Sequence, residues 1–197
     1  MSAKRLISKS AFALLIAATA AVGPLAPMTA LPAQAEKAVA PEKNPPGDIP
    51  DTQVFVTYRS TAGYELKVPE GWARSKSGAD VRFVDKLDAV QVTLSRAPAK
   101  VDMAWVKDSY LPELEKSGRA VKLDTVTLEK LPGGRTFRIA YADNSEPSPV
   151  TGKKVRLEHN LYLFERGGKL AALNLSAPYG ADNVDQWRLM SRSFGWQ

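Results

Sequence analysis

The only histidine of this 197-residue chain, His159, is where acid–base catalysis or metal binding near neutral pH would have to centre. One histidine gives little support to a His-rich metal site or to a catalytic triad. Alternation of apolar residues over positions 155–163 places it on the apolar face of a predicted strand. We therefore predict a buried imidazole held by a hydrogen bond; the alternative is a pH-sensitive group in a pocket wall.

The sequence lacks the motifs of several enzyme classes. It has no G-x-S-x-G elbow, no P-loop, no H-E-x-x-H and no cysteine, which excludes disulfides and thiolate metal sites. Asp80, Asp85 and Asp88 form one acidic group, and Asp143 and Glu146 form another, but neither has the spacing of a calcium loop. We expect solvated loop acids, and we predict no catalytic residue, no metal site and no cofactor.

Aromatic side chains are the stronger candidates for a binding surface. Trp72 follows a Pro-Glu-Gly turn signal at the end of an alternating segment, with Arg74 beside it. A tryptophan there can close the core or line a groove, and closure is the favoured interpretation. Trp105 lies off the main apolar stripe of a predicted helix, so we expect partial exposure. The candidate binding residues are Trp72, Arg74, Trp105 and His159.

These residues are carried mainly by segments with the two-residue period of strands. Gly133-Gly134 and Gly167-Gly168 separate consecutive alternating segments, which predicts turns between antiparallel strands. The expected strand segments are 53–60, 64–68, 80–85, 89–97, 120–131, 135–143, 153–166 and 169–178.

Two segments have the helical period instead. Residues 101–118 place Asp102 as an N-cap and Gly118 as the stop, while Pro112 predicts a kink or a break. Residues 180–196 predict a second helix with Asp182 as its cap. The expected apolar side of this second helix consists of Val184, Trp187, Leu189 and Met190.

The pattern predicts an α+β fold, an α/β/α sandwich. It combines a mostly antiparallel sheet of about seven strands with a central helix and a C-terminal helix. In residues 171–177, both sets of alternating side chains are mainly small or apolar, which is typical of a central strand covered on both faces.

The first residues resemble an export signal. Residues 1–35 combine a basic start, an apolar stretch of about 12 residues, shorter than the roughly 20 that a bilayer span needs, and Ala-Gln-Ala at 33–35. We predict secretory export with cleavage after Ala35, a Pro-rich flexible linker at 36–52, and one domain at 53–197. Removing the three basic residues of the signal lowers the net charge from +6 to +3, which does not favour nucleic-acid binding.

The order of motifs resembles the PsbP-like proteins. This fold family includes the extrinsic subunit of photosystem II, bacterial lipoproteins of the LpqN and DcrB type, and a nuclear Ran-binding protein. The similar stretches, in the family's order, are YELKVPEGWAR at 64–74, SYLPELEKSG at 109–118, LPGGRTFRIAY at 131–141, LEHNLYLFERGGKLAALNLSAP at 157–178 and DQWRLMSRSFGW at 185–196.

The resemblance implies a fold and a non-enzymatic accessory role, but not a specific partner. Photosystem members are linked to manganese, calcium or chloride retention, and no matching set of histidine and acids occurs here. The lipoproteins carry a lipidated cysteine that this chain lacks, so we expect no stable membrane anchor.

Three functional hypotheses follow from the sequence. The first is an exported accessory protein that binds another envelope or secreted protein through a sheet edge or a helix face. The second is a small-ligand or lipid carrier with an apolar cleft between sheet and helix, near Trp72 and His159 if these lie together. A hydrolase is the third, and one histidine with scattered acids gives it the least support.

Overall fold

The computed structural model describes residues 36–197, so the predicted signal peptide at 1–35 lies outside the described residues. Its larger sheet has seven strands and only antiparallel pairings, which confirms the predicted fold class. In spatial order these strands are β3 (Ala73–Ser77), β4 (Asp80–Asp85), β5 (Asp88–Arg96), β9 (Lys169–Pro178), β8 (Arg156–Arg166), β7 (Gly134–Asn144) and β6 (Lys122–Leu131).

The first two predicted strands belong to a second, three-stranded sheet and not to the main sheet. Its order is β1 (Phe55–Ser60), β2 (Tyr64–Pro69) and β10 (Gly195–Trp196). Neither β3, an exposed Ala-Arg-Ser-Lys-Ser segment, nor the two-residue β10 was expected. Both lack a run of alternating apolar residues long enough to mark a strand in the sequence.

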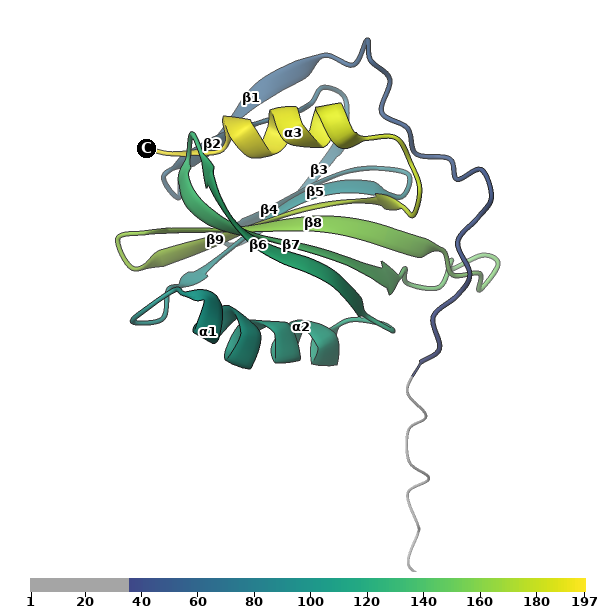
Figure 1. The fold of residues 1–197 in the computed structure, drawn as a ribbon. Coiled ribbons are helices and arrows are strands. Elements are labelled where there is room, and N and C mark those ends of the chain that lie inside the picture. The colour runs from purple at the N-terminus through teal and green to yellow at the C-terminus, as the bar shows by residue number, and fades with distance from the viewer. Residues whose placement is uncertain (1–35) are drawn as a thin grey trace, which may run out of the picture. The chain divides into compact units, whose positions relative to one another are not determined.

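Different elements cover the two faces of the main sheet (Figure 1). One face carries a helical run of α1 (Met103–Trp105), the π-helical turn η1 (Val106–Tyr110) and α2 (Leu111–Ser117). The other face carries α3 (Val184–Ser193) together with β1 and β2. No helix within residues 36–197 is both long enough and apolar enough to cross a bilayer.

Each face of the sheet has its own hydrophobic core. Tyr162 and Phe164 of β8 join the core under α3 and the small sheet, while Leu161 and Leu163 join the core under α1–α2. The central strands therefore carry apolar side chains on both faces, as the sequence predicted for the segment that forms β9. The first core includes Tyr64, Leu66, Val90, Leu173, Met190 and Phe194, and the second includes Val106, Leu111 and Ile139.

The central helical run is continuous, so of the predicted kink or break at Pro112 the break does not occur. A π turn precedes the proline, and the Leu111 amide donates to the Val106 carbonyl, five residues back. Pro112 is the second residue of α2 and has no N–H to donate to the preceding turn, and the π turn lies where the proline interrupts the regular hydrogen-bond pattern. The predicted N-cap is confirmed, because Asp102 Oδ1 accepts the Trp105 amide at 2.9 Å.

The predictions for the C-terminal helix were partly wrong. Asn183, not Asp182, occupies the N-cap position. Trp187 and Met190 are buried as predicted, but Val184 is 63% and Leu189 38% exposed. Leu189 lies two residues from Trp187, about 200° around the helix, so it points away from the core.

Residues 36–52, for which composition predicts a flexible linker, form an extended strap with contacts to the domain. The Val39 amide donates to Asn144 Oδ1 at 3.0 Å, and the Ile49 amide donates to Asn183 Oδ1 at 2.7 Å. The Ile49 side chain is buried in the first core. These partners lie more than 100 residues away in sequence, so a Pro-rich composition gives no sign of them.

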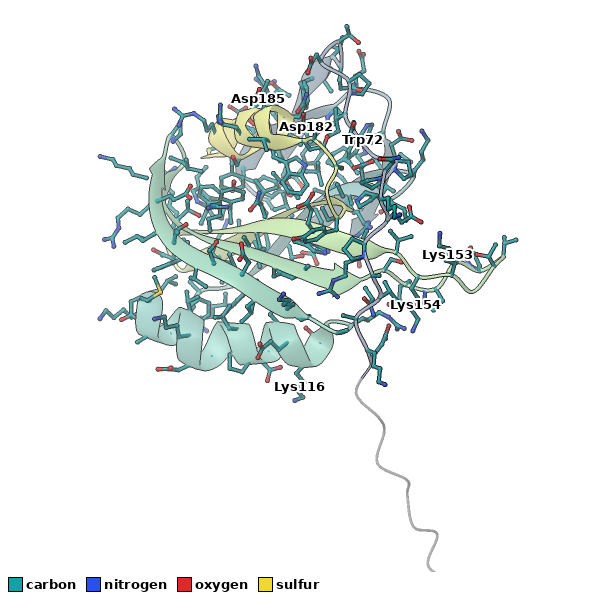
Figure 2. The ribbon with its side chains drawn as sticks, turned by 45° about the vertical axis from the view of Figure 1, so that its right-hand side comes forward. Trp72, Lys116, Lys153, Lys154, Asp182 and Asp185 are labelled. Atoms are coloured by element: carbon teal, nitrogen blue, oxygen red, sulfur yellow. The ribbon has the colours of Figure 1, made fainter. Side chains whose placement is uncertain are left out.

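Glu36 fixes the start of this strap. Its carboxylate contacts Arg119 Nη2 and Lys154 Nζ, each at 2.8 Å, and accepts from Asn144 Nδ2 at 2.9 Å. The hydrogen bond from Lys154 lowers the pKa of Glu36, with Asn144 adding to the shift. Figure 2 shows Lys153 and Lys154 in the loop beside the strap.

Candidate functional site

A groove runs between α3 and the part of the sheet formed by β6, β7 and β8. It consists of an inner cleft of about 380 Å³ and an outer cleft of about 490 Å³, and Asn160 and Trp187 line both. Strap residues, including Val39, close one side of the inner cleft. We call the two clefts together the α3 groove.

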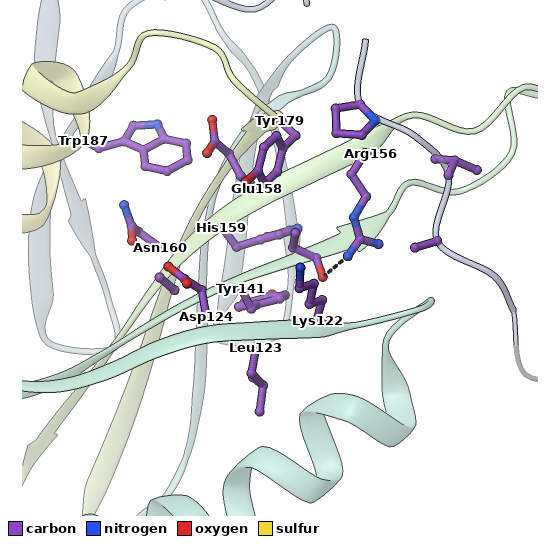
Figure 3. A pocket seen from close by; sticks show the side chains of 15 residues that line it. Lys122, Leu123, Asp124, Tyr141, Arg156, Glu158, His159, Asn160, Tyr179 and Trp187 are labelled. Carbon is purple, nitrogen blue, oxygen red and sulfur yellow. Dashed lines mark hydrogen bonds between the residues drawn. The ribbon is translucent and has the colours of Figure 1, made fainter.

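Polar side chains line the inner cleft (Figure 3), and several of them form hydrogen bonds within the protein. Arg156, only 4% exposed, donates to the carbonyl oxygens of Ala120 and Ala142 at 2.8 and 3.0 Å and to Asn144 Oδ1 at 3.1 Å. Glu158 accepts the Gly180 amide at 3.0 Å, and its burial raises its pKa. Arg156 therefore acts chiefly as a brace for the strand ends.

The outer cleft is rich in arginine. Arg138 Nε donates to Glu129 Oε1 at 2.8 Å, and its Nη1 donates to Asn160 Oδ1 at 3.0 Å, so this side chain is fixed across the sheet. Arg188 and Arg192 reach the same cleft from α3 and are exposed. With three arginines and one glutamate in its lining, the cleft is suited to a negatively charged group.

His159 is buried, as predicted, and belongs to a polar cluster. Its Nε2 lies 2.8 Å from Asp143 Oδ1, and its Nδ1 lies 3.2 Å from Asn174 Nδ2. Its ring stacks on Tyr141, with centroids 4.3 Å apart and planes 6° apart. Burial, with help from nearby Asp143, raises the pKa of Tyr141.

This polar cluster is suited to stabilising the fold rather than to catalysis. In the neutral tautomer with a proton on Nε2, His159 donates to Asp143 and accepts from Asn174, so both ring nitrogens are engaged inside the protein. A general base needs a nitrogen directed at a substrate or nucleophile. Within residues 36–197, no group of three or more histidines and acids could hold a metal ion.

The four residues singled out from the sequence do not form one site. Trp72 is half-buried against the first core, and Arg74 is exposed on the edge strand β3. Trp105 packs against the second core, with its ring 5.5 Å from that of Tyr110. His159 lines the inner cleft, whereas Trp72 lines neither cleft of the α3 groove, so the two do not share it.

Sequence reasoning did not single out the groove itself. Trp187 was assigned to the core, and it is indeed only 7% exposed, yet it lines both clefts. The spacing of Val184, Arg188 and Arg192, four residues apart on one helix face, was a detectable signal. The opposite wall comes from three other strands and could not be assigned without the tertiary structure.

Comparison with known proteins identifies the fold. No family model and no curated protein sequence matches the chain. A solved structure of cyanobacterial PsbP (CyanoP) from Synechocystis sp. PCC 6803 is similar, with a TM-score of 0.51 and 18% identity over 77% of this chain and 98% of that one. The Ran-binding protein Mog1p of Saccharomyces cerevisiae has the same TM-score of 0.51, with 9% identity over 74% and 96% of the two chains. The domain therefore has a PsbP-like fold.

Proposed function

We propose that the protein is an exported, non-catalytic accessory protein that binds another envelope or secreted protein through the α3 groove. The observation that carries the proposal is the groove, whose rim exposes Tyr179 at 44% and Val184 at 63% around Trp187. Exposed apolar groups beside fixed charges are typical of protein-binding surfaces, in which aromatic residues and arginine are enriched.

The composition of the groove favours a protein over a lipid. A lipid carrier needs a mostly apolar, enclosed cavity, whereas both clefts here include charged residues. A hydrolase gains no support from His159, because both of its ring nitrogens contact Asp143 and Asn174. The yeast neighbour Mog1p is a Ran-binding protein, which supports the view that this fold can carry a protein-binding surface.

Export is the second part of the proposal. The apolar stretch and the Ala-Gln-Ala sequence before Glu36 support cleavage after Ala35. The carboxylate contacts of Glu36 with Arg119 and Lys154 would then hold the first residue of the mature chain against the domain. Intact-mass measurement of the exported protein tests this point, and a chain that keeps residues 1–35 would contradict it.

Site-specific crosslinking tests the groove. A photoreactive residue at Val184 should crosslink one envelope protein in intact cells, and the same residue at Val150, 90% exposed in a loop, should not. Val184→Asp should weaken capture of that protein by about tenfold, while Val150→Asp should leave it unchanged. Equal crosslinking at both positions, or capture that is insensitive to Val184→Asp, would overturn the proposal.

A further inference from the structure

The outer edge of β6 is a long open strand beside the α3 groove. β6 ends the order of the seven-stranded sheet, so its outer side pairs with no strand among residues 36–197. It has ten residues, whereas β3 at the opposite edge has five. A register shift between Leu123 and Thr125 interrupts the pairing with β7, which leaves Thr125–Leu131 as a regular seven-residue edge.

This edge forms one wall of the outer cleft. Glu129 and Leu131 of β6 line it from the sheet, and Val184, Arg188 and Arg192 line it from α3. A strand added beside β6 would extend the sheet and direct every second side chain toward the face that carries α3. Backbone hydrogen bonds would then supply affinity, and the cleft would select the side chains.

The charge of the cleft determines which side chains fit. Arg188 has one acidic partner, the exposed Asp185 at 3.0 Å, and Arg192 contacts no acid in the described part of the chain. Arg138 is already bonded to Glu129. The two exposed arginines of α3 therefore remain accessible to a carboxylate, which an arginine binds with directional hydrogen bonds.

We propose that β6 and the outer cleft bind an extended segment of the partner protein, in strand form, with an acidic side chain placed between Arg188 and Arg192. This inference rests on the proposed function, because it names the part of the partner that the groove would accept. The protein's own strap does not compete for the cleft, since its lining residues border only the inner cleft.

A degenerate peptide mixture tests the inference. The purified protein is immobilised and exposed to a mixture of acetylated octapeptides, and the retained pool is sequenced. Asp or Glu should be enriched several-fold at one position, with β-branched or aromatic residues two positions away. In the complex with the best peptide, hydrogen exchange should slow at the amides of residues 125–131.

Charge reversal supplies the matched comparison. Arg188→Glu/Arg192→Glu should weaken binding of the selected peptide by about tenfold or more. Arg74→Glu/Lys76→Glu, on the exposed edge strand β3, changes the net charge equally and should have little effect. Circular dichroism and thermal unfolding verify that both double variants are folded.

Three results would overturn the inference: no retained peptide, a retained pool without acidic enrichment, or self-association of the protein through β6. Failure here is distinguishable from failure of the proposed function. If Val184 still crosslinks an envelope protein while Arg188→Glu/Arg192→Glu leaves capture unchanged, the groove binds a partner of another kind. If Val184 crosslinks nothing, the groove is not the binding surface.

Discussion

At the scale of single residues, His159 illustrates how a residue type common in catalysis becomes structural. Its two nitrogens and its ring face are all used, by Asp143, Asn174 and Tyr141 respectively. A buried polar group contributes to stability mainly because its removal would leave its buried partners without a hydrogen bond. The position of the imidazole is therefore fixed by its neighbours.

Replacement of His159 by Phe tests this interpretation. The phenyl ring can keep the stack on Tyr141, but Asp143 and Asn174 lose a hydrogen-bond partner, so the free energy of unfolding should fall by about 1–3 kcal/mol. Urea denaturation measures the change, and Asp182→Asn, at an exposed position, serves as the control. A variant as stable as the wild type would show that the cluster does not stabilise the fold.

Asp88 gives a pH-dependent prediction at the same scale. It is only 5% exposed, and burial, with Asp85 and Asp48 nearby, raises its pKa from 3.8 to about 7. Between these two values the folded chain keeps a proton that the unfolded chain releases. The free energy of unfolding should therefore fall as the pH rises from about 4 to about 7, and then level off.

Asp88→Asn should remove this dependence, because the amide does not ionise. The variant should be more stable than the wild type by about 1–3 kcal/mol at pH 8, with a difference that shrinks toward pH 4. Asn183 Nδ2, 3.5 Å from Asp88 Oδ1, has a carbonyl acceptor in either protein. Denaturation curves with parallel pH profiles for both proteins would contradict the assignment.

At the scale of elements, the strap is attached through a few side chains. The Asn183 side chain accepts a hydrogen bond from the Ile49 amide at 2.7 Å and donates one to the Gly47 carbonyl at 2.8 Å. One side chain therefore binds both an N–H and a C=O group of the strap backbone. Gly47 itself lies against Asp88 and Pro178, where an added Cβ would come within 2.8 Å of Pro178. This end of the strap covers the buried carboxyl.

Asn183→Ala should loosen that end of the strap. The loss of these two hydrogen bonds, one buried and one partly buried, should lower the free energy of unfolding by about 1–3 kcal/mol and speed hydrogen exchange at the Ile49 amide. Asn144→Ala, at the opposite end, should instead speed exchange at Val39. If Ile49 exchanges equally fast in the wild type and in Asn183→Ala, the strap is not held by this contact.

The sequence predicts elements that leave a local pattern, and it does not predict contacts between distant elements. Alternation located most of the strands, because an apolar face leaves a local signal, and Asp102 was recognisable as a cap from its residue type and its place just before the helical period. The strap, the α3 groove and the contact of His159 with Asp143 depend on pairs of residues on different elements. The tight turns at 132–133 and 167–168 bring β6 to β7 and β8 to β9 locally, whereas the β7–β8 register that places Tyr141 opposite His159 depends on a longer loop.

At the scale of the whole molecule, one sheet separates two cores. Leu163 lies in the core under α1–α2 and Met190 in the core under α3, and both are at most 1% exposed. Neighbouring residues of β8 and β9 point into opposite cores, so neither core can lose its packing without disturbing the strands that support the other.

The two cores should therefore unfold in a single transition. Leu163→Ala and Met190→Ala should each lower the free energy of unfolding by about 2–5 kcal/mol, and their effects should be nearly additive, because they act on separate clusters of one cooperative unit.

Tryptophan fluorescence reports mainly on the first core, where Trp72, Trp187 and Trp196 pack, whereas far-UV circular dichroism reports on the entire backbone. In the wild type and in each of the two variants, the urea transitions of both signals should coincide. If Leu163→Ala shifted the circular dichroism transition while the fluorescence transition stayed in place, the α1–α2 layer would be an independently unfolding unit, and the sheet would not couple the two cores.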